Sequence, residues 1–111
     1  MWWNKYIGIP YEFRGRTKDG ADCYGLVEII QREVFGVDLP NSHTIDVPLS
    51  EVREGDMVRM TELFGGRVLN RHCGVITGDK HILHTTENVG SFNEPLRKAK
   101  HKIKGVYRVV T

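Results

Sequence analysis

Residues 22–36 read DCYGLVEIIQREVFG, and this stretch carries the clearest helical pattern in the chain. Its apolar side chains recur at the spacing of one face of an α-helix: Cys23, Leu26, Val27, Ile30 and Val34. The polar side chains between them are expected on the other face: Glu28, Gln31, Arg32 and Glu33. The pattern therefore predicts one amphipathic helix packed against the rest of the domain.

The residues at the two ends of this stretch predict where the helix begins and ends. Asp22 is a good N-cap, and Gly36 suits the left-handed position that follows a helix. The helix then begins at Cys23. Unpaired N–H groups and the positive end of the helix dipole favour a thiolate there, so Cys23 is a candidate nucleophile. The alternative is an ordinary buried cysteine.

The remainder of the chain is rich in β-forming runs. A helical turn is expected near Trp2–Tyr6, and a long loop over residues 62–70. A polar connection is expected between Pro40 and Val52. The expected strands are Met57–Met60, His72–Thr77, His81–Thr86 and Ile103–Val110. One helix followed by antiparallel strands makes the fold α+β, as a single domain over residues 1–111.

The loop between the second and third of these strands determines their register. A three-residue loop over residues 78–80 places Val75 opposite Leu83 and Ile76 opposite Ile82, so that apolar side chains pair on both faces. A two-residue loop would break this pairing. We therefore predict the longer loop.

The predicted register also brings two histidines together. It places His72 and His84 on the same face of neighbouring strands, an arrangement that suits a general base oriented by a second polar group. The other three histidines, His43, His81 and His101, are expected to be exposed or to make structural hydrogen bonds.

Charge and hydropathy exclude several classes of function. The 16 basic residues nearly balance the 14 acidic ones, and a net charge of +2 does not favour nucleic acid as a partner. The basic run over residues 97–104 is expected to be a solvated loop or strand edge. No membrane span and no signal peptide are expected, so synthesis in the cytoplasm is expected.

The chain has two cysteines, Cys23 and Cys73, which are expected to be free thiols in a cytosolic product. Together with His72 and His84 they are also acceptable zinc ligands. Because His72 and Cys73 are adjacent on a strand, their side chains point to opposite faces, which makes joint ligation awkward. No metal or other cofactor is therefore expected.

Several segments together resemble the NlpC-type peptidoglycan endopeptidases, which are circularly permuted relatives of papain. The matching segments are YIGIPY at residues 6–11, GADCYGLV at 20–27, EGDMV at 54–58, and HCGVI at 72–76 with His84, and their order and spacing cover most of the chain. The resemblance implies a permuted papain-like fold, in which the helix that carries the nucleophile packs on an antiparallel sheet.

The same resemblance implies a role for each motif residue. It implies Cys23 as nucleophile, His72 as general base, His84 as the third residue that orients the imidazole, and Tyr11 as a hydroxyl beside the oxyanion. The backbone N–H of Cys23 is expected to bind the oxyanion as well. The implied reaction is cleavage of a peptidoglycan stem peptide, at the bond between D-glutamate and the diamino acid.

The resemblance is closer to the members encoded by tailed phages and prophages. The shared features are an early tryptophan, the loop GRTKDG at residues 15–20, an aromatic residue after the nucleophile, and GVYR at 105–108. These features imply a tail-tip protein of the virion, with other tail proteins as partners. The chain departs from the common family pattern at residues 14–16, where it has RGR, and at Tyr24, where serine is more usual.

Two alternatives to a peptidoglycan endopeptidase stay open. The first is a structural part of a phage tail that keeps the peptidase fold without turnover. The second is an acyltransferase or amidase that uses the same thioester chemistry with another acceptor. We predict the cysteine endopeptidase.

Overall fold

The computed structural model describes residues 1–110, without the side chains of residues 64 and 79. Thr111, which the predicted single domain includes, lies outside the described residues. The helices are η1 (Trp2–Tyr6), α1 (Cys23–Phe35), η2 (Leu39–Asn41), η3 (Leu49–Glu51), η4 (Gly78–Lys80), α2 (Leu96–Ala99) and η5 (Lys100–Lys102). The strands are β1 (Arg16–Thr17), β2 (Gly20–Ala21), β3 (His43–Val47), β4 (Met57–Phe64), β5 (Arg67–Thr77), β6 (His81–Thr86), β7 (Gly90–Pro95) and β8 (Ile103–Val110).

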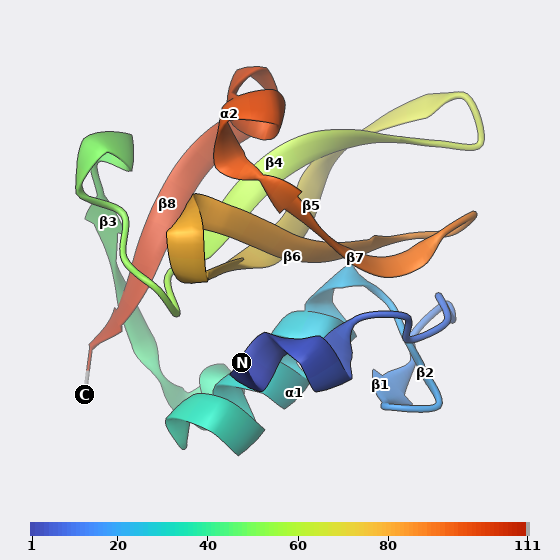
Figure 1. Ribbon diagram of the computed structural model, residues 1–111, viewed down its shortest axis with the longest axis horizontal. Helices are drawn as coiled ribbons and strands as arrows, with labels where there is room; N and C mark the ends of the chain where they lie inside the picture. The colour runs from blue at the N-terminus through green and yellow to red at the C-terminus, as the bar shows by residue number, and fades with distance from the viewer. Residues whose placement is uncertain (111) are drawn as a thin grey trace.

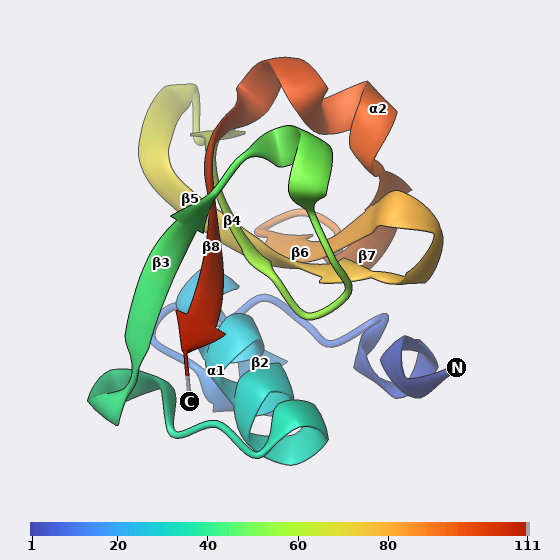
Figure 2. The same cartoon turned by 90° about the vertical axis from the view of Figure 1, so that its left-hand side faces the viewer.

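Six of these strands form one antiparallel sheet, in the order β3-β8-β4-β5-β6-β7. The short strands β1 and β2 pair separately, just before α1. Figure 1 shows the sheet between two layers, with α1 and η1 on one face and α2 on the other. The turned view in Figure 2 shows the same arrangement. The predicted α+β architecture is confirmed.

Both faces of the sheet are buried by apolar side chains. Leu26 and Ile30 of α1 pack with Val75 and Leu83 on one face. On the other face, the buried cluster includes these side chains of the sheet and α2: Val58, Met60, Ile76, Ile82, Val106 and Ala99. Alternate residues along β4, β5 and β6 thus serve opposite cores, because successive strand side chains point to opposite faces.

The predicted limits of the helix are confirmed. Asp22 caps α1 by accepting a hydrogen bond from the Gly25 N–H at 2.7 Å, and Gly36 ends it in the left-handed conformation, with φ 68°. The assignment of Gln31 to the polar face is wrong. Gln31 is buried, and its side-chain amide donates to the Gly55 carbonyl at 2.9 Å. This bond offsets the cost of burying the amide.

The structure confirms the predicted register of the β5–β6 hairpin. Val75 lies opposite Leu83 and Ile76 opposite Ile82, with the loop over residues 78–80. The last strand and the helical turn at η1 also have their predicted limits. Where both faces of the sheet are buried, pairing apolar residues on each face was therefore sufficient to predict the strand register.

Predictions for the more polar segments are wrong in three places. The predicted loop at residues 62–70 is largely strand, because β4 and β5 continue to a tight turn at Gly65 and Gly66. The predicted connection before Val52 contains β3. The basic run over residues 97–104, expected to be a solvated loop or strand edge, lies in α2, η5 and the start of β8. These segments have an exposed face, so main-chain hydrogen bonding rather than an apolar pattern determines their structure.

Among residues 1–110, none of the helices has both the length and the apolar character needed to cross a bilayer.

A buried carboxylate fixes β8 to the turn before β4. Asp56 is 3% exposed and accepts two hydrogen bonds at 2.9 Å from the guanidinium of Arg108. It also accepts a bond from the Arg53 N–H at 2.8 Å. Removing the carboxylate would leave these donors without their partner.

We expect Asp56→Ala to lower the free energy of unfolding by about 2–4 kcal/mol, because it breaks a charged hydrogen-bonded pair. Chemical denaturation followed by circular dichroism measures the change. Asp46→Ala, which removes an exposed carboxylate from β3, is the control and should change stability by less than about 0.5 kcal/mol. Equal stability of the two variants would contradict the role given to Asp56.

Candidate active site

The nucleophile candidate is held by the loop that precedes α1. Arg16 donates to Asp22 at 2.7 Å, and the same carboxylate oxygen caps the helix. Gly25 makes the close approach possible, because a Cβ at this position would lie 2.0 Å from the Gly15 carbonyl oxygen. A glycine two residues after Cys23 is thus required to pack the loop against the first turn of the helix.

The surroundings of Cys23 favour its thiolate. A hydrogen bond with the Cys73 thiol lowers the pKa of Cys23, and this effect is opposed by partial burial. Hydrogen bonding to His72 and the charge of that imidazole lower the pKa further, far below the ordinary range of a cysteine. The helix N-terminus acts in the same direction. The Cys23 residue is partly exposed.

The pKa values of the two cysteines shift in opposite directions. Both are free thiols, but the pKa of Cys73 is raised by its hydrogen bond to Cys23, by burial and by the negative charge of Cys23. Cys73 therefore keeps its proton and donates it in a hydrogen bond to the neighbouring sulfur. Of the two, only Cys23 has the character of a nucleophile.

The structure brings the two predicted histidines together. His72 Nε2 lies 2.8 Å from His84 Nδ1, and both side chains are fully buried. Because Nε2 of His72 is engaged by His84, the ring nitrogen left to interact with Cys23 is Nδ1. Cys23, His72 and His84 thus form one continuous polar chain.

Gly74 makes the close approach of the two histidines possible. A Cβ at this position would lie 3.0 Å from the His84 Cβ and 2.9 Å from the Leu83 carbonyl oxygen. The pairing between β5 and β6 ends at Val75 and Leu83, directly beside Gly74. A larger residue would push β6 away from the part of β5 that carries His72.

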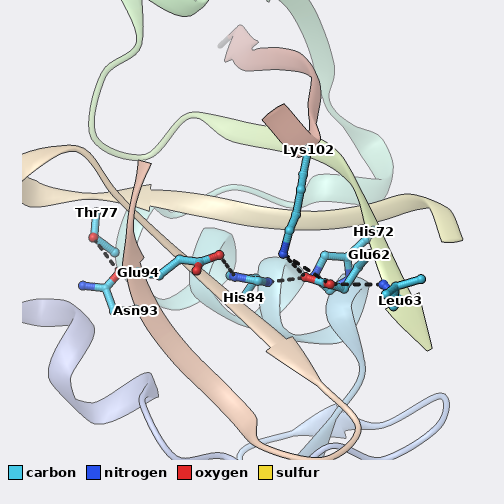
Figure 3. Close-up of polar contacts among 8 residues, drawn as sticks. All are labelled: Glu62, Leu63, His72, Thr77, His84, Asn93, Glu94 and Lys102. Carbon is cyan, nitrogen blue, oxygen red and sulfur yellow. Dashed lines mark hydrogen bonds and ion pairs between the residues drawn. The ribbon is translucent and has the colours of Figure 1, made fainter. Parts of the chain in front are cut away.

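His84 also contacts a carboxylate on the next strand. Its Nε2 lies 2.8 Å from Glu94 Oε1, so the ring is bonded at both nitrogens, as Figure 3 shows. Burial and the nearby His72 lower the pKa of His84, while Glu94 and Glu62 oppose this. His84 is therefore favoured as a neutral imidazole between its two partners.

A second carboxylate, Glu62, lies beside the histidine pair. It accepts hydrogen bonds from Lys102 at 3.2 and 3.4 Å and from the Leu63 N–H at 3.1 Å (Figure 3). Burial raises the pKa of Glu62, but these bonds and the charges of Lys102 and His72 outweigh it and lower the pKa overall. Glu62 adds negative charge to the surroundings of the imidazoles.

Glu62, His72 and His84 are also residue types that bind metal ions. Potential ligand atoms of Glu62, His72 and His84 lie within 4.8 Å of one another among the described residues. Glu62 is already bonded to Lys102, and the two imidazoles share a hydrogen bond at 2.8 Å. Hydrogen bonds of this kind suit proton transfer between these side chains rather than metal ligation. The zinc ligand set considered from the sequence also includes Cys23 and Cys73, which are outside this cluster.

Tyr11 lies close enough to Cys23 for the charge of that residue to affect its pKa. It forms an isolated bridge with Ala21, two residues before Cys23. Partial burial raises the pKa of Tyr11, and the charge of Cys23 raises it further, so its hydroxyl keeps its proton and can donate. Of the remaining histidines, His43 and His101 are exposed and His81 is partly buried.

Sequence reasoning missed four residues around the histidines: Glu62, Cys73 as a donor, Glu94 and Lys102. Glu62 fell in a predicted loop, and Glu94 lies on a strand that was not predicted. Lys102 was grouped with solvated charges, although it bonds to Glu62. Glu94 could be found only from its place two residues after Phe92, the strand partner of His84. That inference requires the pairing of β7 with β6 to be known.

This combination of a thiol at a helix N-terminus and an imidazole from an antiparallel sheet defines a papain-like α+β domain. The NlpC/P60 family model matches residues 8–105. The chain belongs to the NlpC/P60 family.

Curated relatives are consistent with this assignment. The chain is 35% identical over 104 residues to the murein DD-endopeptidase MepS/murein LD-carboxypeptidase of Escherichia coli (strain K12), covering 85% of this chain and 53% of that protein. It is 32% identical over 91 residues to the gamma-DL-glutamyl hydrolase of Bacillus subtilis (strain 168), covering 76% and 22%. The chain thus spans about half of the first relative and less of the second.

Solved structures share the fold. The NlpC/p60 domain of the peptidoglycan hydrolase SagA superposes with a TM-score of 0.66 at 19% identity, covering 96% of this chain and 91% of that one. An NlpC/P60 family protein from Bacillus cereus ATCC 10987 gives a TM-score of 0.71 at 20% identity, covering 96% and 37%. At such identities the likeness establishes the fold.

We expect Cys23 to react with iodoacetamide at neutral pH at a rate that stays nearly constant until the pH falls well below the ordinary cysteine value of about 8.5. Cys73→Ala and His72→Ala should each move the rate profile to higher pH, because each removes a partner that stabilises the thiolate. Mass spectrometry of the alkylated peptide identifies the modified cysteine. Half-maximal reaction near pH 8.5 in the unmodified sequence would contradict the assignment.

Proposed function

We propose that this domain is a cysteine endopeptidase that cleaves a stem-peptide bond of bacterial peptidoglycan. Cys23 is the nucleophile, His72 the general base and His84 the residue that orients His72. The observation that carries the proposal is the chain of contacts from the partly exposed residue Cys23 to a buried pair of imidazoles. Family membership supports the same chemistry.

In the proposed reaction, Nδ1 of His72 takes the Cys23 proton and the thiolate attacks the peptide carbonyl carbon. The backbone N–H of Cys23 and the Tyr11 hydroxyl donate to the oxyanion that forms. Collapse of the intermediate breaks the C–N bond, and His72 returns its proton to the departing amine. Water then hydrolyses the thioester, which restores the thiol and releases the new carboxyl group.

We propose that the peptide binds in a hollow lined by neighbours of Cys23. Its lining includes Tyr24, which follows Cys23, and Cys73, which contacts it, together with Arg59 and Arg71. The two guanidinium groups supply positive charge and can pair with carboxylates. Stem peptides carry free carboxylates, so the charge of this surface is complementary to the proposed substrate.

The relatives' names suggest different bonds within such a substrate. One is a DD-endopeptidase and LD-carboxypeptidase that acts on murein, and another is a gamma-DL-glutamyl hydrolase. We propose the bond between D-glutamate and the diamino acid, as the resemblance implies. The masses of the released fragments distinguish this cleavage from the others, and an amine acceptor in place of water would indicate an acyltransferase.

We expect purified peptidoglycan to release stem-peptide fragments with the unmodified sequence, and Cys23→Ala and His72→Ala to lower the rate by several orders of magnitude. Liquid chromatography with mass spectrometry measures the products. His101→Ala, which changes an exposed histidine, is the control and should retain full activity. Digestion by Cys23→Ala as fast as by the unmodified sequence would refute the mechanism.

We further propose that the domain acts in the tail tip of a phage or prophage, where it helps the particle to penetrate the cell wall. The early tryptophans, the loop at residues 15–20 and the aromatic Tyr24 support this assignment. In the structure this loop is tied to the nucleophile, because Arg16 pairs with Asp22 and lies 5.4 Å from the Tyr24 ring centroid. The partners would be other tail proteins, and the location the virion.

A prophage that encodes Cys23→Ala tests this role and its structural alternative together. We expect normal numbers of particles by electron microscopy but fewer infections per particle, because assembly needs the fold and wall penetration needs the thiol. Full infectivity would favour a purely structural part. Particles without the protein, detected by mass spectrometry, would contradict a tail location.

A further inference from the structure

Glu94 lies on the far side of His84 from His72. In the β6–β7 ladder, His84 is opposite Phe92 and Ile82 is opposite Glu94, so Glu94 is the diagonal neighbour of His84 on the same face. Its Oε1 lies 2.8 Å from His84 Nε2. The His84 side chain is fully buried and the Glu94 side chain is 22% exposed.

The position of Glu94 is fixed by its strand. β7 is paired along β6 from Gly90 to Pro95, and Asn93, next to Glu94, accepts a hydrogen bond from the Thr77 hydroxyl at 3.0 Å. Figure 3 shows His84 between Glu94 and His72, with side chains from β5, β6 and β7 in one row. The carboxylate is therefore held against the imidazole by the sheet.

The chemistry of the three groups determines where the protons lie. An ionised carboxylate only accepts hydrogen bonds, so Nε2 of His84 must carry the proton in its bond to Glu94. A neutral imidazole protonated at Nε2 has its lone pair at Nδ1. The bond at 2.8 Å to His72 then requires His72 Nε2–H to donate, which leaves the basic lone pair of His72 on Nδ1, toward Cys23.

We propose that Glu94 is a positioning residue that selects the Nε2–H tautomer of His84 and, through it, makes Nδ1 of His72 the base for Cys23. The inference rests on the proposed function for its catalytic consequence. Glu94 touches neither the nucleophile nor a reacting atom, so it acts through His84.

Other charged groups face His84, but they do not make this contact. Glu62 of β4 lies within 4.8 Å of both imidazoles, yet its carboxylate accepts from Lys102 and from the Leu63 N–H. His72 of β5 occupies Nδ1 of His84. Glu94 is the group bonded to Nε2, and this bond specifies the tautomer.

Loss of the Glu94 carboxylate would allow the other tautomer. With the proton on Nδ1, His84 would donate to His72 Nε2, and Nδ1 of His72 would carry the remaining hydrogen. The base nitrogen would then face away from the thiol. In addition, an imidazolium at His72 would meet an N–H of His84 instead of a lone pair, so the thiolate of Cys23 would lose stabilisation.

The test compares Glu94→Leu, which removes the acceptor, with Glu94→Gln, which keeps an acceptor oxygen but removes the charge. In Glu94→Leu we expect kcat on a peptidoglycan fragment to fall about ten- to a hundredfold with little change in KM, and Glu94→Gln to fall less. The pH of half-maximal Cys23 alkylation should rise by about one unit in Glu94→Leu. Asp46→Asn, which removes an exposed charge at the opposite edge of the sheet, is the matched control.

Nitrogen NMR of the histidine rings reads the tautomer directly. In the unmodified sequence His84 should show a protonated Nε2 and an unprotonated Nδ1, and in Glu94→Leu a mixture of tautomers or the reverse. These spectra and the alkylation profile need no peptidoglycan. If both shift as expected while the unmodified chain digests no peptidoglycan, the role of Glu94 stands and the proposed substrate fails. Unchanged ring spectra in Glu94→Leu, with thermal melting confirming the fold, overturn the inference.

Discussion

The contact between the N-terminus of α1 and the end of β5 is the constraint on which the rest of the structure depends. Cys23 interacts there with both His72 and Cys73, although alternation along β5 points those two side chains in different directions. The pairing of β5 with β6 runs from Val75 to Thr77, so it ends just beside the two residues that contact Cys23. Two glycines, Gly25 and Gly74, permit the close approaches on the two sides of this contact.

The buried polar side chains of the site form hydrogen bonds with one another. His72 and His84 are fully buried, so their hydrogen bonds must be satisfied within the protein. The series from Cys23 through the two imidazoles to Glu94 provides each group with a partner, and it begins and ends at partly exposed residues. A network of this kind supports one protonation pattern, because changing one proton changes every bond along it.

The sequence was informative where a residue type has few structural options. The Asp22 cap and Gly36 specify the limits of α1, and apolar pairing on two buried faces specifies the hairpin that carries His72 and His84. These features were sufficient to predict the thiol and the two imidazoles, which the structure brings together. They did not require knowledge of the whole sheet.

The outer groups of the site could not be predicted because they depend on long-range pairing. Glu94 reaches His84 only through the register of β7, whose residues have no regular apolar alternation. Lys102 and Glu62 meet across elements 40 residues apart in the chain. Gln31 was assigned to the polar face because it is a polar residue. Its side-chain amide can be buried because it donates a hydrogen bond to the distant Gly55 carbonyl, and helical periodicity does not predict such a bond.

Ultraviolet titration of the thiolate measures whether the contact with His72 and Cys73 ionises Cys23. We expect one thiolate absorbance already present at neutral pH, which disappears in Cys23→Ser and is reduced in His72→Ala. Thiolate absorbance that developed only near pH 8.5, the ordinary value for a free cysteine, or a neutral-pH signal that persisted in Cys23→Ser, would contradict ionisation of Cys23 by this contact.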